Sequence, residues 1–262
     1  MLAQRILTAL VLIPLVLWGV FAATDFWFAS VLGIILLLGA WEWAKMAGLN
    51  SIGSLLYLAL LAVLFYGAQF LPPVVILSPA LLWWSVAIGL VITYPKYHEF
   101  WQQSLAVRLF AGLGLLIPTF VALICIRDSG EGAWDLVYLM LLIWGADSAA
   151  YFSGRRFGHR KLAPKLSPGK TWEGFIGAQL AGLFIAIWSV FYFEISFWFA
   201  LVLAVTVVTI SVVGDLFESL AKRESGVKDS GHILPGHGGV MDRIDSLTAA
   251  APLFSLFWMY QP

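Results

Sequence analysis

Long apolar runs separated by short polar stretches form the main pattern of the chain. Nine runs can be drawn, near residues 4–22, 26–46, 51–70, 74–94, 105–126, 133–153, 174–193, 197–217 and 245–260, of which the last is short. A helix of about 20 apolar residues spans the hydrocarbon core of a bilayer. The pattern lacks the alternating segments that mark a membrane β-barrel. We therefore predict an all-α fold, a polytopic integral membrane helical bundle with about nine transmembrane helices.

The first run follows Gln4 and Arg5 and could be taken for a secretory signal. It is longer than a usual signal core and eight further runs follow it, so we expect a retained helix. We expect one membrane domain over residues 1–262. Its N-terminal transmembrane helices lie in 1–104, and its C-terminal region, 105–262, carries two long polar loops at 154–173 and 218–244.

Positive charge is distributed unevenly along the chain. Charged residues make up 11% of the sequence against 61% hydrophobic residues, and Lys and Arg total 15. If the N-terminus is cytoplasmic, fourteen of these 15 fall at inner ends and loops, and Arg127 alone falls outside. Because Lys and Arg collect on the cytoplasmic side, we predict a cytoplasmic N-terminus and two cytoplasmic polar loops. The single cysteine, Cys125, lies in a predicted span, so we expect no disulfide within the chain.

Charge is concentrated in one polar stretch, Gly214–Asp245, which holds six carboxylates, four basic residues and two histidines. Ionisable groups near hydrocarbon are costly unless they line a wet cavity. Four of its residues are spaced i, i+3, i+4 and i+7, and so share one helix face: Asp215, Glu218, Ser219 and Lys222. This acidic-then-basic stripe indicates a lined cavity. The alternative is an interfacial helix end with internal Glu–Lys pairing.

A glycine-rich loop and an acidic pair complete this stretch. Consecutive glycine N–H groups, as at Gly238 and Gly239, can form a nest for anionic oxygens. Asp242 and Asp245 then share a face at the start of the ninth helix, where the helix dipole alone would also favour carboxylates. Acidic residues on two helices suit Mg²⁺, which binds through one or two carboxylates plus substrate phosphates. Zinc is disfavoured because the histidines, His237 among them, lack further ligands at a suitable spacing.

The other polar loop contributes a second group of candidates. Asp147 is expected about a turn and a half inside the cytoplasmic end of the sixth span. A basic loop beside a membrane is usually an effect of the positive-inside rule. That rule does not explain Ser167, Lys170 and Thr171, which form a tight turn before the seventh helix. Lysine here could hold the phosphate oxygens of a nucleotide or of a lipid headgroup.

These residues resemble the signature of the phosphatidate cytidylyltransferases, also called CDP-diacylglycerol synthases. The resemblance rests on SLAKR at 219–223, KD at 228–229 and LPGHGGVMDRID at 234–245, with support from 147–174. Ala221 departs from the pattern, since the family usually has a larger aliphatic residue there. The motifs cover about a hundred residues, and the rest of the chain agrees in being hydrophobic helices.

The resemblance implies a Mg²⁺-dependent transfer of CMP from CTP to phosphatidic acid, with a second cation as an option. It implies metal ligation by Asp215, Asp242 and Asp245, with 105–262 as the catalytic region. Further residues of the catalytic set would be Lys222, Arg223, Lys228, Asp229 and Arg243. The substrate-binding set would be Ser167, Lys170, Thr171, Ser219, His237, Gly238, Gly239 and Asp147. For Asp147, a place outside the metal's ligands, a cytosine contact and structural pairing all stay open.

The expected partners are CTP, phosphatidic acid and membrane lipids, with no nucleic acid, and the family analogy suggests a homodimer. We expect a bacterial inner-membrane enzyme with its active site facing the cytoplasm. Alternatives are a cytidylyltransferase or CTP-dependent kinase acting on another lipid. A CDP-alcohol phosphotransferase would need a DG-x2-AR motif, which the sequence lacks. An ion-coupled transporter would favour acids near the midplane of the membrane rather than at the cytoplasmic ends.

Overall fold

The structure, a computed structural model, describes residues 14–234, 236 and 238–261. Residues 14–21 are helical, and nine further helices follow in the described part of the chain. Their bounds are α2 Asp25–Met46, α3 Ser51–Ala68, α4 Pro73–Thr93, α5 His98–Gln103, α6 Leu105–Arg127, α7 Ala133–Phe157, α8 Trp172–Tyr192, α9 Phe197–Glu224 and α10 Met241–Met259. The predicted all-α membrane bundle is confirmed.

Seven of these helices, α2, α3, α4, α6, α7, α8 and α9, are long and apolar enough to cross a membrane. They correspond to the second to eighth predicted runs. The first predicted run lies partly outside the described residues. The ninth is present as α10, but it begins at Met241, before the apolar run, and its first residues include Asp242. The charged residues at its start keep α10 out of the set of candidate spans in the described chain.

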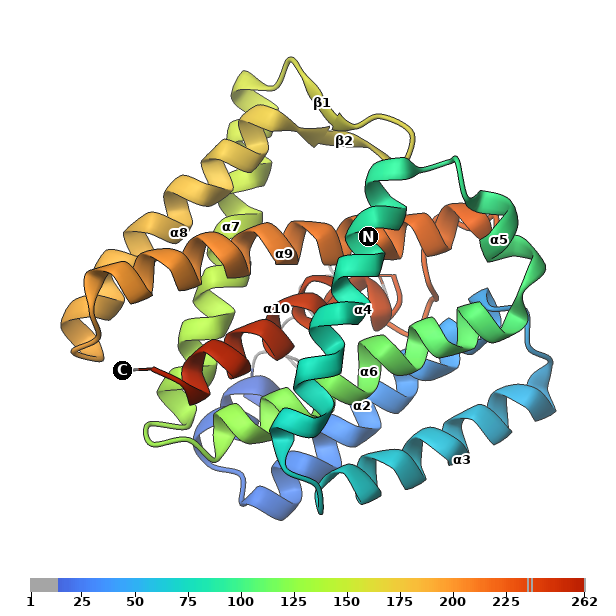
Figure 1. Cartoon of the computed structure of the whole chain (residues 1–262), viewed down its shortest axis with the longest axis horizontal. Coiled ribbons are helices and arrows are strands. Elements are labelled where there is room, and N and C mark those ends of the chain that lie inside the picture. Colours follow the sequence, from blue (N-terminus) through green and yellow to red (C-terminus); the bar gives the residue numbers. More distant parts are fainter. Residues whose placement is uncertain (1–13, 235, 237, 262) are drawn as a thin grey trace.

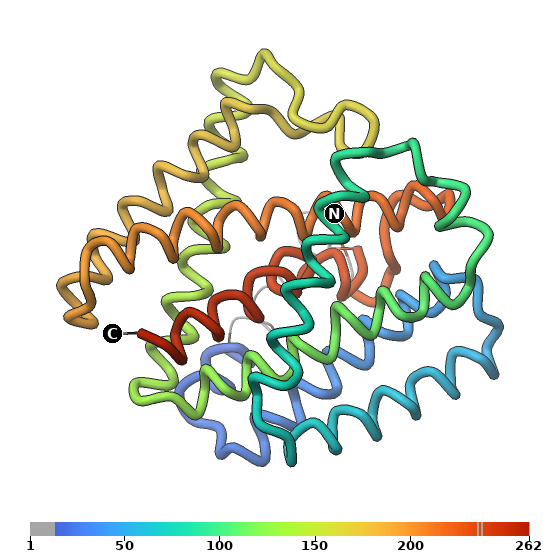
Figure 2. Tube along the Cα trace, viewed as in Figure 1, coloured from blue at the N-terminus to red at the C-terminus, as the bar shows by residue number. Residues whose placement is uncertain are grey.

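The helices form a crossed bundle with α9 as its long central member (Figure 1). α10 packs against α9 and α6, while α8 packs against α7 and α9. The chain trace shows α3 on the outer side of α2, away from α9 (Figure 2). Large side chains fill the centre: Trp43 of α2 stacks on Phe217 of α9, with ring centroids 6.3 Å apart.

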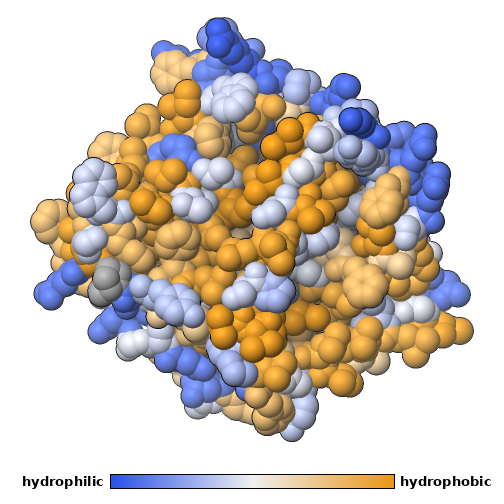
Figure 3. Space-filling view, in the orientation of Figure 1, coloured by the Kyte–Doolittle hydropathy of each residue, from blue (hydrophilic) through white to orange (hydrophobic). Residues whose placement is uncertain are grey.

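The surface matches a protein that spans a bilayer. Apolar side chains cover the middle of the face seen in Figure 3, and hydrophilic ones gather towards its opposite edges. Exposed large residues include Phe26 at 71%, Phe184 at 74% and Phe191 at 81%. Such exposure would be costly in water but is favourable against lipid chains.

Two loop boundaries differ from those predicted. α9 continues to Glu224 and α10 begins at Met241, so both helices extend into the predicted loop 218–244. α7 continues to Phe157, and the segment after it contains a small antiparallel hairpin of β1, Lys161–Ala163, and β2, Ser167–Thr171. Counting apolar residues underestimates a helix that extends beyond the hydrocarbon, because the exposed turns need no apolar side chains.

Candidate functional site

The inner end of α9 carries the predicted stripe on one face. Lys222 Nζ lies 2.6 Å from Glu218 Oε2, and Ser219 Oγ lies 3.5 Å from Asp215 Oδ1. The Glu218 carboxylate is 2% exposed, and its second oxygen has no hydrogen-bond partner. The stripe therefore faces the interior of the protein, towards α10, rather than solvent.

A close crossing of α9 and α10 brings further acids to this face. A Cβ on Gly214 would lie 2.6 Å from the Asp245 carbonyl oxygen, so the helices touch there through backbone. The Asp245 side chain accepts the Ser246 N–H at 2.7 Å and interacts electrostatically with Asp215 and Glu218. Three carboxylates from two helices thus share one region, which is unfavourable unless cations join them.

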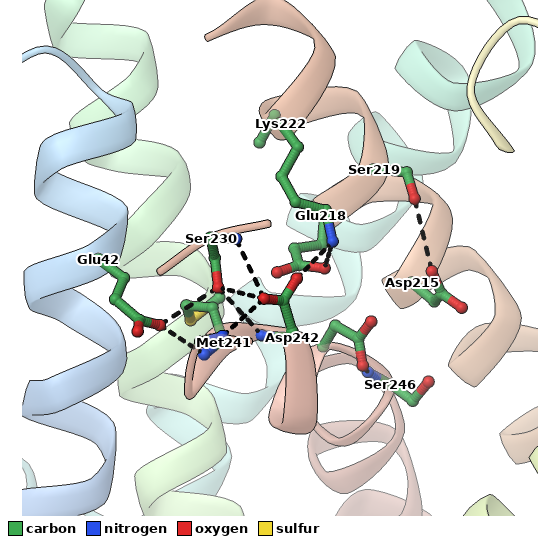
Figure 4. A network of polar contacts seen from close by, with 12 residues as sticks. Glu42, Asp215, Glu218, Ser219, Lys222, Ser230, Met241, Asp242 and Ser246 are labelled. Carbon is green, nitrogen blue, oxygen red and sulfur yellow. Dashed lines mark hydrogen bonds and ion pairs between the residues drawn. The ribbon is translucent and has the colours of Figure 1, made fainter. Parts of the chain in front are cut away.

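Asp242, at the start of α10, anchors the loop at 225–240. Its Oδ1 accepts from Lys222 Nζ at 2.6 Å. Its Oδ2 accepts from the backbone N–H groups of Ser230, at 3.0 Å, and Gly239, at 2.8 Å, and lies 2.9 Å from the Ser230 hydroxyl (Figure 4). The anion bound by this glycine-rich loop is therefore a carboxylate of the chain itself.

The hairpin supplies the second half of the site. Lys170 of β2 reaches across to α9, where its Nζ lies 2.5 Å from Asp215 Oδ2. Asp147 interacts electrostatically with both Lys170 and Asp215. It lies ten residues before the end of α7 at Phe157, about 15 Å along the helix.

Other predicted residues have different surroundings. Thr171 caps α8 by accepting the Gly174 N–H at 3.1 Å, and Ser167 pairs with Ala163 in the hairpin. Arg223 Nε donates to the Leu166 carbonyl oxygen at 3.3 Å.

Three further predicted residues, Lys228, Asp229 and Arg243, are exposed. The Gly238 carbonyl oxygen accepts the Leu234 N–H at 3.0 Å, and His237 lies outside the described residues.

The acidic region is not a preformed metal cage. Among the described residues, no three His, Cys, Asp or Glu side chains form a group that could hold a metal ion alone. Mg²⁺ commonly binds through one or two carboxylates and completes its coordination with substrate phosphates and water. Asp215 and Asp245, which interact electrostatically, could supply two such carboxylates.

Glu42 of α2 is the residue that sequence reasoning missed. It is 2% exposed, and its Oε2 accepts the Met241 N–H at 2.9 Å and lies 3.2 Å from the Ser230 hydroxyl (Figure 4). The site therefore includes a residue from the first 104 positions, outside the region 105–262 expected to supply it. The available signal was an acid inside an apolar run, which marks a functional candidate in a membrane helix.

Comparisons with known proteins identify the family of the chain. The model of the Cytidylyltransferase family matches residues 3–261. The chain is 43% identical to a phosphatidate cytidylyltransferase of Haemophilus influenzae, covering 99% of both chains. It is 46% identical to that of Pseudomonas aeruginosa over 98% of this chain and 97% of the relative. A third relative with the same name, from Brucella suis, is 47% identical over 50% of this chain and 48% of its own.

Proposed function

The chain belongs to the cytidylyltransferase family, and from this membership we infer that it transfers CMP from CTP to phosphatidic acid. The products are CDP-diacylglycerol and pyrophosphate, so the protein is a nucleotidyltransferase of phospholipid biosynthesis. Both near-full-length relatives reported above carry the name phosphatidate cytidylyltransferase, which supports this assignment.

The observation that carries the mechanism is the convergence of α7, β2, α9 and α10 on one charged region. Lys170 and Lys222 meet carboxylates there through contacts of 2.5 and 2.6 Å. The lipid phosphate is already a nucleophile, so no serine or cysteine nucleophile and no general base is needed. Catalysis consists of aligning two polyanions and neutralising charge on the transferring phosphoryl group.

The donor set fits Mg²⁺ ligated by Asp215 and Asp245, with CTP phosphates completing the coordination. Bound there, the ion would neutralise negative charge on the phosphates. The family resemblance also implies Asp242 as a metal ligand, but both its oxygens accept hydrogen bonds in this structure. We therefore assign Asp242 first to holding the loop; ligation would require Lys222 to release Oδ1.

The basic residues around the cluster would bind the phosphates of CTP and the leaving pyrophosphate. Lys170 is the natural first contact, because a triphosphate can compete with Asp215 for its ammonium group. Lys222 is held by Glu218 and Asp242, whereas Lys228 and Arg243 are exposed and can meet the nucleotide from the cytoplasm.

The apolar helices make this an integral membrane protein, and the bacterial relatives support a plasma-membrane location. The Lys and Arg distribution supports an active site that faces the cytoplasm. The homodimer stays a prediction from family analogy.

The test uses purified protein in detergent with phosphatidic acid, Mg²⁺ and CTP labelled at either the α- or the γ-phosphate. We expect lipid-bound label from α-labelled CTP and labelled pyrophosphate from γ-labelled CTP. Transfer of the γ-label to lipid would instead identify a CTP-dependent kinase. Absence of labelled lipid in both arms would refute both reactions, and omission of Mg²⁺ should abolish product.

A further inference from the structure

Glu42 is a buried acid, and the partners it has among the described residues are backbone N–H and hydroxyl groups. Its hydrogen-bonded neighbours are the Met241 N–H, at 2.9 Å, and the Ser230 hydroxyl, at 3.2 Å. Its other oxygen, Oε1, is buried and has no hydrogen-bond partner among the described residues. A buried carboxylate with this few partners is costly, so its presence calls for a compensating role.

Both neighbours of Glu42 also hold Asp242 in place. Met241 directly precedes Asp242 in the chain, and Ser230 binds Asp242 through its backbone N–H and its hydroxyl. The Ser230 hydroxyl lies between the carboxylates of Glu42 and Asp242, and Glu42 also binds the residue before Asp242. A shift of Glu42 would therefore move both Ser230 and Met241, and Asp242 with them. Asp242 in turn accepts from Lys222 on the α9 stripe at 2.6 Å.

The packing leaves Glu42 little freedom. A Cβ on Gly231 would collide with the Glu42 carboxylate, and one on Gly239 would lie 2.5 Å from Oε2. The first residues of α10 also lack a side-chain cap of their own, since Val240 at the N-cap position provides none. Glu42 supplies that cap from α2, 199 residues away in sequence from Met241.

We propose that Glu42 is a positioning residue for nucleotidyl transfer, which acts through Ser230 and Met241 to fix Asp242 against Lys222. The proposal rests on the proposed function. It gives the N-terminal helices a part in the reaction, since Glu42 of α2 contacts both Ser230 and the Met241 N–H at the start of α10. If Glu42 only capped α10, its replacement would lower stability, but its effect on kcat would not depend on whether Ser230 is also replaced.

The first experiment is a double-mutant cycle with Glu42→Leu and Ser230→Ala, assayed for CMP transfer from CTP to phosphatidate. Partners that orient the direct contacts of a site typically contribute ~10–100-fold to activity. We expect each single variant to lose kcat by about that factor with KM for phosphatidate near wild type. The kcat of the double variant should be no lower than that of the less active single variant, because both substitutions break the same contacts between Glu42, Ser230 and Asp242.

Conservative and control variants separate positioning from folding. Glu42→Gln keeps an acceptor oxygen for Met241 and Ser230, so it should retain most of the kcat that Glu42→Leu loses. Tyr57→Phe removes another partly buried hydrogen bond, from the Tyr57 hydroxyl to the Leu109 carbonyl at 3.0 Å, and should leave kcat unchanged. Additive losses in the cycle would overturn the proposal. Wild-type kcat in Ser230→Ala would overturn it even if Glu42→Leu fails to fold.

A second readout does not depend on the substrate. Hydrogen exchange of the peptide covering 225–240 should quicken in Glu42→Gln slightly and in Glu42→Leu strongly, while Tyr57→Phe leaves it unchanged. Unchanged exchange in folded Glu42→Leu would overturn the positioning role. An inactive wild-type protein whose loop still responds to Glu42 would instead count against the proposed function alone.

Discussion

Lys222 should be a main contributor to the stability of the end of the bundle that carries Glu218 and Asp242. Its ammonium lies 2.6 Å from both Glu218 and Asp242, and the three side chains are 14%, 2% and 10% exposed. Lys222→Met keeps the length of the side chain but leaves two largely buried carboxylates without their cation. Glu218 is affected most, since its other oxygen has no partner.

Removing one member of a buried ion pair typically costs ~3–5 kcal/mol, because the partner's desolvation is no longer compensated. Lys222 is partly exposed and water can reach it, so we expect about 3 kcal/mol, the lower end of that range. A domain of this size shifts its Tm by ~2–4 °C per kcal/mol, which predicts a fall of about 6–12 °C.

The assay is thermal unfolding in detergent, followed by tryptophan fluorescence and by loss of the monodisperse peak in size-exclusion chromatography. Lys45→Met is the matched control, because Lys45 is exposed and its contact is with the Trp41 ring at 4.7 Å. Adding Glu218→Gln to Lys222→Met should recover part of the lost Tm by removing the stranded charge. The reasoning would be refuted if Lys222→Met had the same Tm as wild type, or if the double variant had a lower Tm than Lys222→Met.

Three further outcomes are expected. Asp215→Asn should abolish transfer with little change in Tm, whereas Asp242→Asn should lower both activity and Tm, because Asp242 also anchors the loop; equal Tm values would contradict this division. In a variant without the native cysteine, Lys165→Cys should react with membrane-impermeant maleimide from the cytoplasmic face only, and labelling from outside would reverse the topology. Gly214→Ala should push α10 away from α9, lower the free energy of unfolding by about 1–3 kcal/mol and reduce activity. Gly89→Ala, with nothing within 4 Å of its new methyl group, should change neither stability nor activity.

The helices were predictable because a membrane span depends on local composition. The apolar runs from residue 26 to residue 217 correspond to α2, α3, α4, α6, α7, α8 and α9. The stripe from Asp215 to Lys222 was predictable for a similar reason, since i, i+3, i+4 and i+7 positions share a face in any helix. The hairpin at 161–171 was not, because strands of three and five residues leave too short an alternating pattern.

The function of individual acids was harder to predict, because it depends on contacts between distant segments. Asp242 has the same sequence environment whether it binds a metal or holds a loop, and its partner Ser230 becomes visible only in the folded chain. Glu42 lies 188 residues from Ser230, so no local pattern connects them. The sequence pointed to Gly214–Asp245 as the stretch that carries the candidate site, but the contacts of each acid within it depend on tertiary packing.

The charge of the converging groups explains why a substrate-borne cation suits this site. Carboxylates are supplied by Asp147, Asp215, Glu218, Asp242 and Asp245, whereas the ammonium groups paired with them are those of Lys170 and Lys222. If all are ionised, this set carries an excess of negative charge, and CTP and phosphatidate add more. A divalent cation that arrives with the triphosphate would reduce this repulsion and release Lys170 from Asp215 for the phosphates. Binding of the nucleotide should therefore depend on the metal, because the excess negative charge of the site would otherwise repel the triphosphate.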